Sequence, residues 1–202
     1  MTGMVQSTFS RELESWLKQK GPKTLGSLVV VFKERSFAII ILVLMAFPAL
    51  PLPTGGITHV FELITMLIAG EMVVGMQGVW LPRSWLHKEL GPFVQGKFIP
   101  YLIRRVRWFE RFSRPRFNDL LQRQSFGRIT GGLLLLFALG AFLAPPFSGL
   151  DTLPALGAVM LALSLILGDI TIFAGGIAVG AIGLGLVLAF GTVTVDLIKH
   201  FF

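Results

Sequence analysis

Five ionisable side chains lie inside apolar segments of this 202-residue chain: His59, Glu62, Glu71, Asp169 and Asp196, the last of which is most simply a terminal residue beside Lys199 and His200. A charged side chain at the centre of a bilayer costs about 2.5–3.5 kcal/mol or more, so such residues usually pair with one another or mark a pathway for protons or ions. His59 and Glu62 are three positions apart and would share one helix face. This spacing predicts that the two side chains share a proton or a hydrogen bond.

Glu71 and Asp169 can be interpreted in two ways. Each follows a glycine, Gly70 and Gly168, near the end of an apolar run. As a symmetric pair, the two carboxylates would couple transport to a proton or a cation. Alternatively, each ends a helix at the membrane interface with its charge in water. Glu71 lies about two and a half helical turns beyond Glu62 and so points away from it, which predicts two separate sites.

The composition is that of an integral membrane protein. Hydrophobic residues make up 53% of the chain and charged residues 14%, and the mean hydropathy is +0.75. An ordinary soluble domain carries about 25% charged residues. The net charge of +7 could indicate nucleic acid, but the basic residues adjoin apolar runs and alternate with aromatic residues. We therefore expect anionic lipid headgroups as partners, and no nucleic acid.

Positive charge is concentrated in two blocks. Of the 18 Lys and Arg residues, six lie within 11–35, eleven lie within 83–128, and Lys199 stands apart. Cytoplasmic segments beside membrane spans are enriched in Lys and Arg, so both blocks should face the cytosol. We expect a multi-pass protein with a cytosolic N-terminus, in which the apolar stretch 36–79 enters and leaves on the same side.

These patterns predict an all-α fold in four parts. Residues 1–35 would form cytosolic or interfacial amphipathic helices, and 36–79 a first membrane helix-break-helix unit. Residues 80–128 would form a basic interfacial segment, and 129–202 a second unit followed by a glycine-rich transmembrane helix. The breaks are rich in prolines and glycines, which stop a helix. They contain Pro48, Pro51, Pro53, Gly55, Gly56, Pro145 and Pro146.

The arm before the first break is too short to cross a bilayer alone. Residues 36–47 would extend about 18 Å as a helix, against a hydrocarbon core of roughly 30 Å. Either the helix continues upstream through residues 33–35 with its charges reaching the interface, or it is half of a re-entrant hairpin whose tip lies at membrane depth. We favour the re-entrant hairpin.

The two membrane units resemble each other. An offset of 98 positions aligns Pro48 with Pro146 and Glu71 with Asp169. In transport proteins, interrupted segments at corresponding positions point to a site near the membrane midplane. A duplicated unit and a transport function are therefore plausible on sequence grounds.

Within the basic segment, arginines recur with helical spacing on one side of a helix and large apolar residues on the other. The candidates for contact with lipid headgroups or a partner are Arg104, Arg105, Arg107, Arg111 and Arg114. The apolar side consists of Phe98, Leu102, Val106, Phe109 and Phe112. This side either lies on lipid in the headgroup region or packs on the protein's own helices.

In the last apolar segment, Gly176 and Gly180 form a GxxxG pair, and Gly185 continues a ridge of small residues. Such a ridge lets another helix approach closely, so we expect it to serve in helix packing. The partner helix could belong to a second copy, which would make the protein a homodimer.

Several short motifs occur in a characteristic order. They are Pro51-Leu-Pro-Thr-Gly-Gly, Trp80-Leu-Pro-Arg83, Ala144-Pro-Pro-Phe147, Leu153-Pro-Ala-Leu156 and Gly168-Asp169. In content and order they resemble the ExoD-type exopolysaccharide synthesis family, over roughly residues 25–195. The resemblance implies a bacterial inner-membrane protein that takes part in exopolysaccharide production or cell-envelope function. It also makes the exopolysaccharide synthesis machinery a candidate partner.

The sequence carries no catalytic signature such as a GxSxG elbow, an HExxH pair or a Walker A motif. There are three histidines and no cysteine, so we expect no enzyme activity, no cofactor and no metal. Two functions remain. The chain is either a transporter-like protein that moves an ion, lipid or polysaccharide precursor through the broken hairpins, or a non-transporting scaffold that regulates the synthesis machinery through its basic surface.

Overall fold

The computed structural model describes residues 9–32, 35–51, 57–80, 82–113, 124–145 and 148–201, most of which are helical. In chain order the helices are α1 (Phe9–Lys18), α2 (Leu25–Phe32), α3 (Ser36–Met45), α4 (Ile57–Val74), α5 (Arg83–Leu86), the π-helix η2 (Val94–Phe98), α6 (Ile99–Phe112), α8 (Gln124–Leu143), α9 (Thr152–Leu167) and α10 (Ile170–Phe201). Within the described ranges, β-type pairing is limited to an isolated bridge between Thr24 and Glu89. The predicted all-α fold is confirmed.

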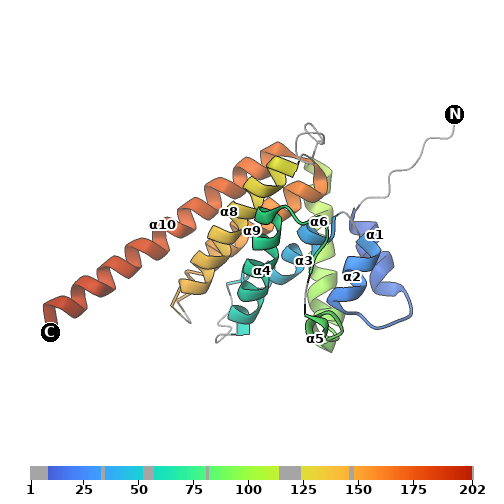
Figure 1. Cartoon of the computed structure of the whole chain (residues 1–202), viewed down its shortest axis with the longest axis horizontal. Helices are drawn as coiled ribbons and strands as arrows, with labels where there is room; N and C mark the ends of the chain where they lie inside the picture. The colour runs from blue at the N-terminus through green and yellow to red at the C-terminus, as the bar shows by residue number, and fades with distance from the viewer. Residues whose placement is uncertain are drawn as a thin grey trace.

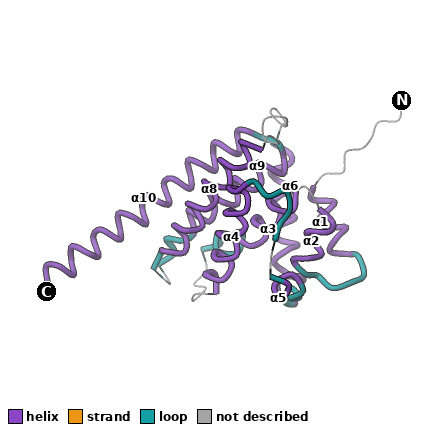
Figure 2. Tube along the Cα trace, in the orientation of Figure 1, coloured by secondary structure: helices purple, strands orange, loops and turns teal. Residues whose placement is uncertain are grey.

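The short helix α3 forms the core of the molecule. All of its side chains are buried except that of Phe37, which is partly exposed. Helices α2, α4 and α9 pack against it, and it lies in the middle of the bundle (Figure 2). Its sequence, SFAIIILVLM, has no polar side, and a helix that is apolar all round has to be buried.

This enclosure explains why the arm before the first break is so short. Because protein surrounds α3, the helix can satisfy its apolar surface without crossing a bilayer. Helix α2 ends at Phe32 and packs beside α3; residues 33 and 34, through which α3 could continue upstream, lie outside the described residues. A position of the break at membrane depth stays a prediction.

Two helices are long and apolar enough to cross a membrane. They are α8, with 20 residues, and the part of α10 from Ile170 to Gly191, with 22 residues. Helix α9 is apolar but has 16 residues. Beyond the bundle, α10 continues away from the other helices to the C-terminal end (Figure 1). These helices indicate a membrane protein, while the multi-pass topology and the cytosolic N-terminus stay predictions.

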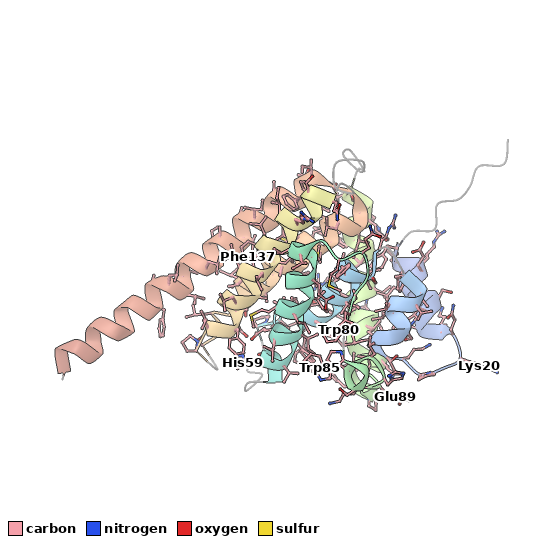
Figure 3. The ribbon with its side chains drawn as sticks, in the orientation of Figure 1. Lys20, His59, Trp80, Trp85, Glu89 and Phe137 are labelled. Carbon is pink, nitrogen blue, oxygen red and sulfur yellow. The ribbon has the colours of Figure 1, made fainter. Side chains whose placement is uncertain are left out.

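Glycines bring α9 and α10 into close contact. A Cβ atom added to Gly157 would lie 2.5 Å from the Cα atom of Gly180, and one added to Gly176 would lie 3.0 Å from the backbone nitrogen of Leu161. A Cβ atom on Gly180 would also meet the ring of Phe137 in α8, which is labelled in Figure 3. Gly176 and Gly180 of the ridge therefore pack inside the chain, whereas a Cβ atom on Gly185 would meet nothing within 4 Å. The homodimer expected from this ridge stays a prediction.

The close approach of α9 and α10 can be tested with two glycine variants. Gly157→Ala places a methyl group against the backbone of Gly180, which cannot rotate away, and overpacking of this kind costs about 1–3 kcal/mol. Gly185→Ala is the matched control, because a Cβ atom there meets nothing within 4 Å and alanine favours the helix. Circular dichroism in one detergent should show a lower unfolding midpoint for Gly157→Ala alone. Equal midpoints would contradict the close packing.

Candidate functional site

The start of α4 and the end of α8 lie side by side at one end of the bundle, where an ionisable pair lies. Nδ1 of His59 is 2.8 Å from Oε2 of Glu62. The His59 ring lies 5.2 Å from the ring of Phe142, near the end of α8, and Figure 3 shows His59 near the start of α4. Asp151, in the second break, is close enough for its charge to act on both His59 and Glu62. We call His59, Glu62 and Asp151 the junction cluster.

Glu62 is fully buried although it carries an acidic group. Its side chain is 0% exposed, whereas that of His59 is 31% exposed. Oε1 of Glu62 and Oγ1 of Thr65, one turn further along α4, have no hydrogen-bond partner among the described residues. Polar atoms buried in native proteins are nearly always paired, so an unpaired carboxylate oxygen points to a functional demand at this position. The cluster leads from a partly exposed imidazole to a buried carboxylate.

Glu71 and Asp169 each accept a hydrogen bond from nearby backbone. Glu71 lies near the end of α4, away from the junction cluster, and its Oε2 accepts the N–H of Trp80, in the loop before α5, at 2.8 Å; its Oε1 is buried without a partner among the described residues. Oδ1 of Asp169 accepts the N–H of Thr171 at 2.8 Å, as an N-cap residue does in the first turn of a helix. Both side chains are buried, so neither carboxylate stands in water as the helix-end interpretation has it. The symmetric pair stays a prediction.

The first break is held by Phe47. Its ring lies 5.7 Å from that of Phe61 in α4 and 5.6 Å from that of Phe98 at the start of α6. In the second break, the carbonyl oxygen of Pro145 accepts the hydroxyl of Ser148 at 2.6 Å. Aromatic packing and local hydrogen bonds thus fix the segments that flank the junction cluster. Of the predicted break residues, Pro48, Pro51 and Pro145 are described, and Pro53, Gly55, Gly56 and Pro146 lie outside the described residues.

Helix α6 packs its apolar side on the protein, which is one of the two alternatives expected from its sequence. Its buried residues are Ile99, Leu102, Ile103 and Val106, and α1 packs against it. Phe112, expected on the apolar side, is 69% exposed. The exposed arginines are Arg104, Arg105, Arg107 and Arg111, while Arg114 lies outside the described residues.

Two polar contacts join α1 to α6. The carboxylate of Glu110 accepts the backbone N–H and the hydroxyl of Ser10, at 2.7 and 2.6 Å. The carboxylate of Glu14 accepts hydrogen bonds from Arg107 and Lys18, each at 2.8 Å. Sequence reasoning missed the contacts between helices because they join residues 100 and 93 positions apart. Only the Glu14–Lys18 pair, four residues apart on one helix, has a local signal.

No group of three or more His, Asp or Glu residues is placed to hold a metal ion within the part of the chain that the structure describes. Histidine suits proton exchange because its ordinary pKa lies close to neutral pH.

Comparison with known proteins places the chain in a family. The profile of the family described as "Exopolysaccharide synthesis, ExoD" matches residues 9–189. The chain belongs to the ExoD family. This confirms the resemblance seen in the ordered motifs, and it connects the chain with a family involved in exopolysaccharide synthesis.

Two relatives support the family assignment. Protein ExoD of Rhizobium meliloti is 29% identical over 162 residues, which cover 76% of this chain and 64% of that protein. An uncharacterized protein of Synechocystis is 27% identical over 150 residues, which cover 73% of this chain and 70% of that protein. The chain thus spans a little under two thirds of the Rhizobium ExoD protein. No solved structure shows a significant match.

Acid should loosen the contact between α1 and α6 in this ExoD-family protein. The hydrogen bond and charge of Lys18, followed by those of Arg107, lower the pKa of Glu14 below its ordinary value of 4.5. A carboxylate with a lowered pKa stabilises the folded state fully above its unfolded-state pKa, and this contribution is lost as pH falls through the folded-state pKa. The contact should therefore weaken between about pH 5 and pH 3.

The distance between nitroxide labels on the two helices measures this effect. The chain has no cysteine, so Ser15→Cys and Arg105→Cys give two unique labelling positions. Their distance distribution should broaden on acidification, and Glu14→Gln should be broad already at pH 7 and change little. Glu89→Gln, at an exposed position elsewhere, should behave as the parent. A transition in Glu14→Gln as large as in the parent would contradict the role of Glu14.

Proposed function

We propose that this ExoD-family protein is a transporter-like protein of a bacterial inner membrane that moves protons through the junction cluster in support of exopolysaccharide synthesis. The observation that carries the proposal is Glu62. It is a fully buried carboxylate with one oxygen bonded to His59 and the other without a partner among the described residues. The family match supports a role in exopolysaccharide synthesis, and the two candidate membrane helices support a location in a membrane.

The geometry of the pair suits a proton relay. The imidazole of His59 is partly exposed and hydrogen-bonded to the buried carboxylate, so a proton taken up by His59 can pass to Glu62 over one hydrogen bond. Asp151, the residue just before α9, adds a third ionisable group that interacts electrostatically with both members of the pair.

The position of the cluster also supports transport. It lies where two interrupted helical segments come together, with His59 after the first break and Phe142 before the second, ring to ring at 5.2 Å. Ionisable residues within apolar segments are costly and commonly belong to ion or proton pathways. Interrupted segments are a recognised place for such sites in transporters. We propose on the same grounds that the protein is not an enzyme and needs no cofactor.

A second candidate function is that of a scaffold for the synthesis machinery. It is favoured by the exposed arginines of α6, of which Arg107 bonds to Glu14 of α1 while Arg104, Arg105 and Arg111 form no ion pair with α1 among the described residues. Under this proposal, replacing Arg104, Arg105, Arg107 and Arg111 by Gln should abolish exopolysaccharide output while the protein still inserts in the membrane. Substitutions in the junction cluster should then have little effect.

Proton flux into liposomes tests the transport proposal. Purified protein is reconstituted around a pH-sensitive dye, and a potassium diffusion potential provides the driving force. Glu62→Gln removes the ionisable group with almost no change of shape, and we expect a loss of at least tenfold in protein-dependent flux. His59→Ala should reduce flux less, because Glu62 remains.

Glu71→Gln is the matched control, since it removes one carboxylate from the same helix while leaving an oxygen to accept the N–H of Trp80. This variant should keep its flux. Equal loss in Glu62→Gln and Glu71→Gln, or flux in Glu62→Gln equal to the parent, would sink the transport proposal. Exopolysaccharide output of cells with the same variants should follow the flux.

A further inference from the structure

We infer that the outer face of α6 binds the phosphate groups of anionic phospholipids. The outer face is defined by Tyr101, Arg104, Arg105, Trp108 and Arg111, which together line one shallow groove. This inference goes beyond transport through the junction cluster and does not depend on it.

Most of the arginines of the outer face form no ion pair among the described residues. Of the acidic residues nearby, Glu110 accepts hydrogen bonds from Ser10. Glu14 forms ion pairs with Lys18 and Arg107. Among the described residues, Arg104 and Arg111 have no acidic partner. Exposed guanidinium groups without a carboxylate partner are well suited to phosphate, whose oxygens match their forked donors.

One arginine of the face is already held in place. The Nε–H of Arg105 donates to the hydroxyl of Tyr101 at 3.0 Å, and its guanidinium lies 5.1 Å from the centre of the same ring. These contacts restrict the side chain before any ligand arrives, so less conformational entropy is lost on binding. Arg105 lines the groove together with Arg104 and Trp108.

The outer face ends beside the start of a candidate membrane helix. Trp108 and Phe112 line one pocket together with Asp169, Thr171 and Ile172, which form the beginning of α10. The span Ile170–Gly191 begins at this level, so a bilayer crossed by it would have its headgroups here. Trp108 is 54% exposed and Phe112 69% exposed, as expected of aromatic anchors in the headgroup region.

This position decides between lipid and other polyanions. A single-stranded nucleic acid also offers phosphates and bases that stack on aromatic rings. A face that adjoins the first turn of a membrane helix, however, meets lipid phosphates before it meets any soluble ligand. Arginines near a membrane surface contribute about 1 kcal/mol each to the binding of anionic lipid, roughly a fivefold change in affinity.

Native mass spectrometry of the detergent-solubilised full chain tests the inference. Phosphatidylglycerol and phosphatidylcholine are titrated separately, and bound lipids are counted on the intact protein. We expect the parent to prefer phosphatidylglycerol and the triple variant Arg104→Gln, Arg105→Gln, Arg111→Gln to lose at least tenfold in affinity for it. The affinity of the parent should also fall with added salt, because exposed charges are screened.

The matched control removes the same number of charges elsewhere. Lys20, Lys88 and Lys97 are exposed, and their replacement by Gln should leave phosphatidylglycerol binding within about twofold. A second triple variant, Arg104→Lys, Arg105→Lys, Arg111→Lys, keeps the positive charge. It should retain most of the phosphatidylglycerol binding if the Gln variant loses binding through its charge and not through misfolding. Circular dichroism confirms the helix content of each variant.

Three outcomes would overturn the inference. The first is equal binding of phosphatidylglycerol by the parent and by the Arg-to-Gln variant. The second is an equal loss of phosphatidylglycerol affinity in the lysine control, which would mean that binding depends on net charge alone and not on the outer face. The third is displacement of the bound lipid by inorganic phosphate or by a single-stranded oligonucleotide at lower concentration than phosphatidylglycerol, which would assign the arginines to a soluble ligand.

Discussion

The arrangement of the whole bundle depends on the burial of α3. Each large aliphatic side chain removed from water contributes roughly 1.5–3 kcal/mol, and the run Ile39–Met45 is buried without interruption. Such a helix must be covered on every side, and α2, α4 and α9 do so. Because α4 follows the first break and α9 follows the second, one core helix holds the two apolar parts of the chain together. The closeness of the start of α4, the end of α8 and the start of α9 at the junction cluster is a consequence of that packing.

The buried carboxylates of the apolar helices differ in the groups to which they are hydrogen-bonded, and this difference draws attention to Glu62. One oxygen of Glu71 accepts a backbone N–H beyond the end of α4, and Asp169 begins α10. Asp169 thus satisfies a backbone group that the start of a helix leaves unpaired, whereas Glu71 ties the loop before α5 to α4 and keeps one oxygen without a partner among the described residues. Glu62 lies in the interior of α4 and serves no helix end. Its burial costs free energy without a structural return, which is why function is sought there.

The residues show which features a sequence reveals. The His59–Glu62 spacing implies a contact because three positions on a helix are neighbours whatever surrounds them. The all-α fold follows from apolar runs punctuated by proline and glycine. By contrast, the hydrogen bond from Ser10 to Glu110 joins residues 100 positions apart. It depends on how α1 packs against α6.

The glycine ridge illustrates the same limit. Its pattern shows that a helix approaches closely, but not which helix, and here Gly180 faces Gly157 of the same chain. Asp151 likewise lies just before α9, where the helical periodicity of the sequence gives no information. It joins the cluster only through the tertiary packing of α9. The local part of the site was thus predictable, and the tertiary part depended on packing around α3.

Charge at the two ends of the bundle supports one orientation for the proposed pathway. Helices α8 and α10 begin side by side, with the rings of Phe126 and Phe173 4.9 Å apart. Arg128 lies at the same end, where its guanidinium donates to the carbonyl oxygen of Val74 at 3.4 Å. Basic residues beside the starts of membrane helices favour the cytosolic side. The junction cluster, at the other end of α4, would then open toward the opposite face of the membrane. A proton entering there would meet the partly exposed imidazole of His59 first and the buried carboxylate of Glu62 second. The more exposed group therefore comes first along the proposed path.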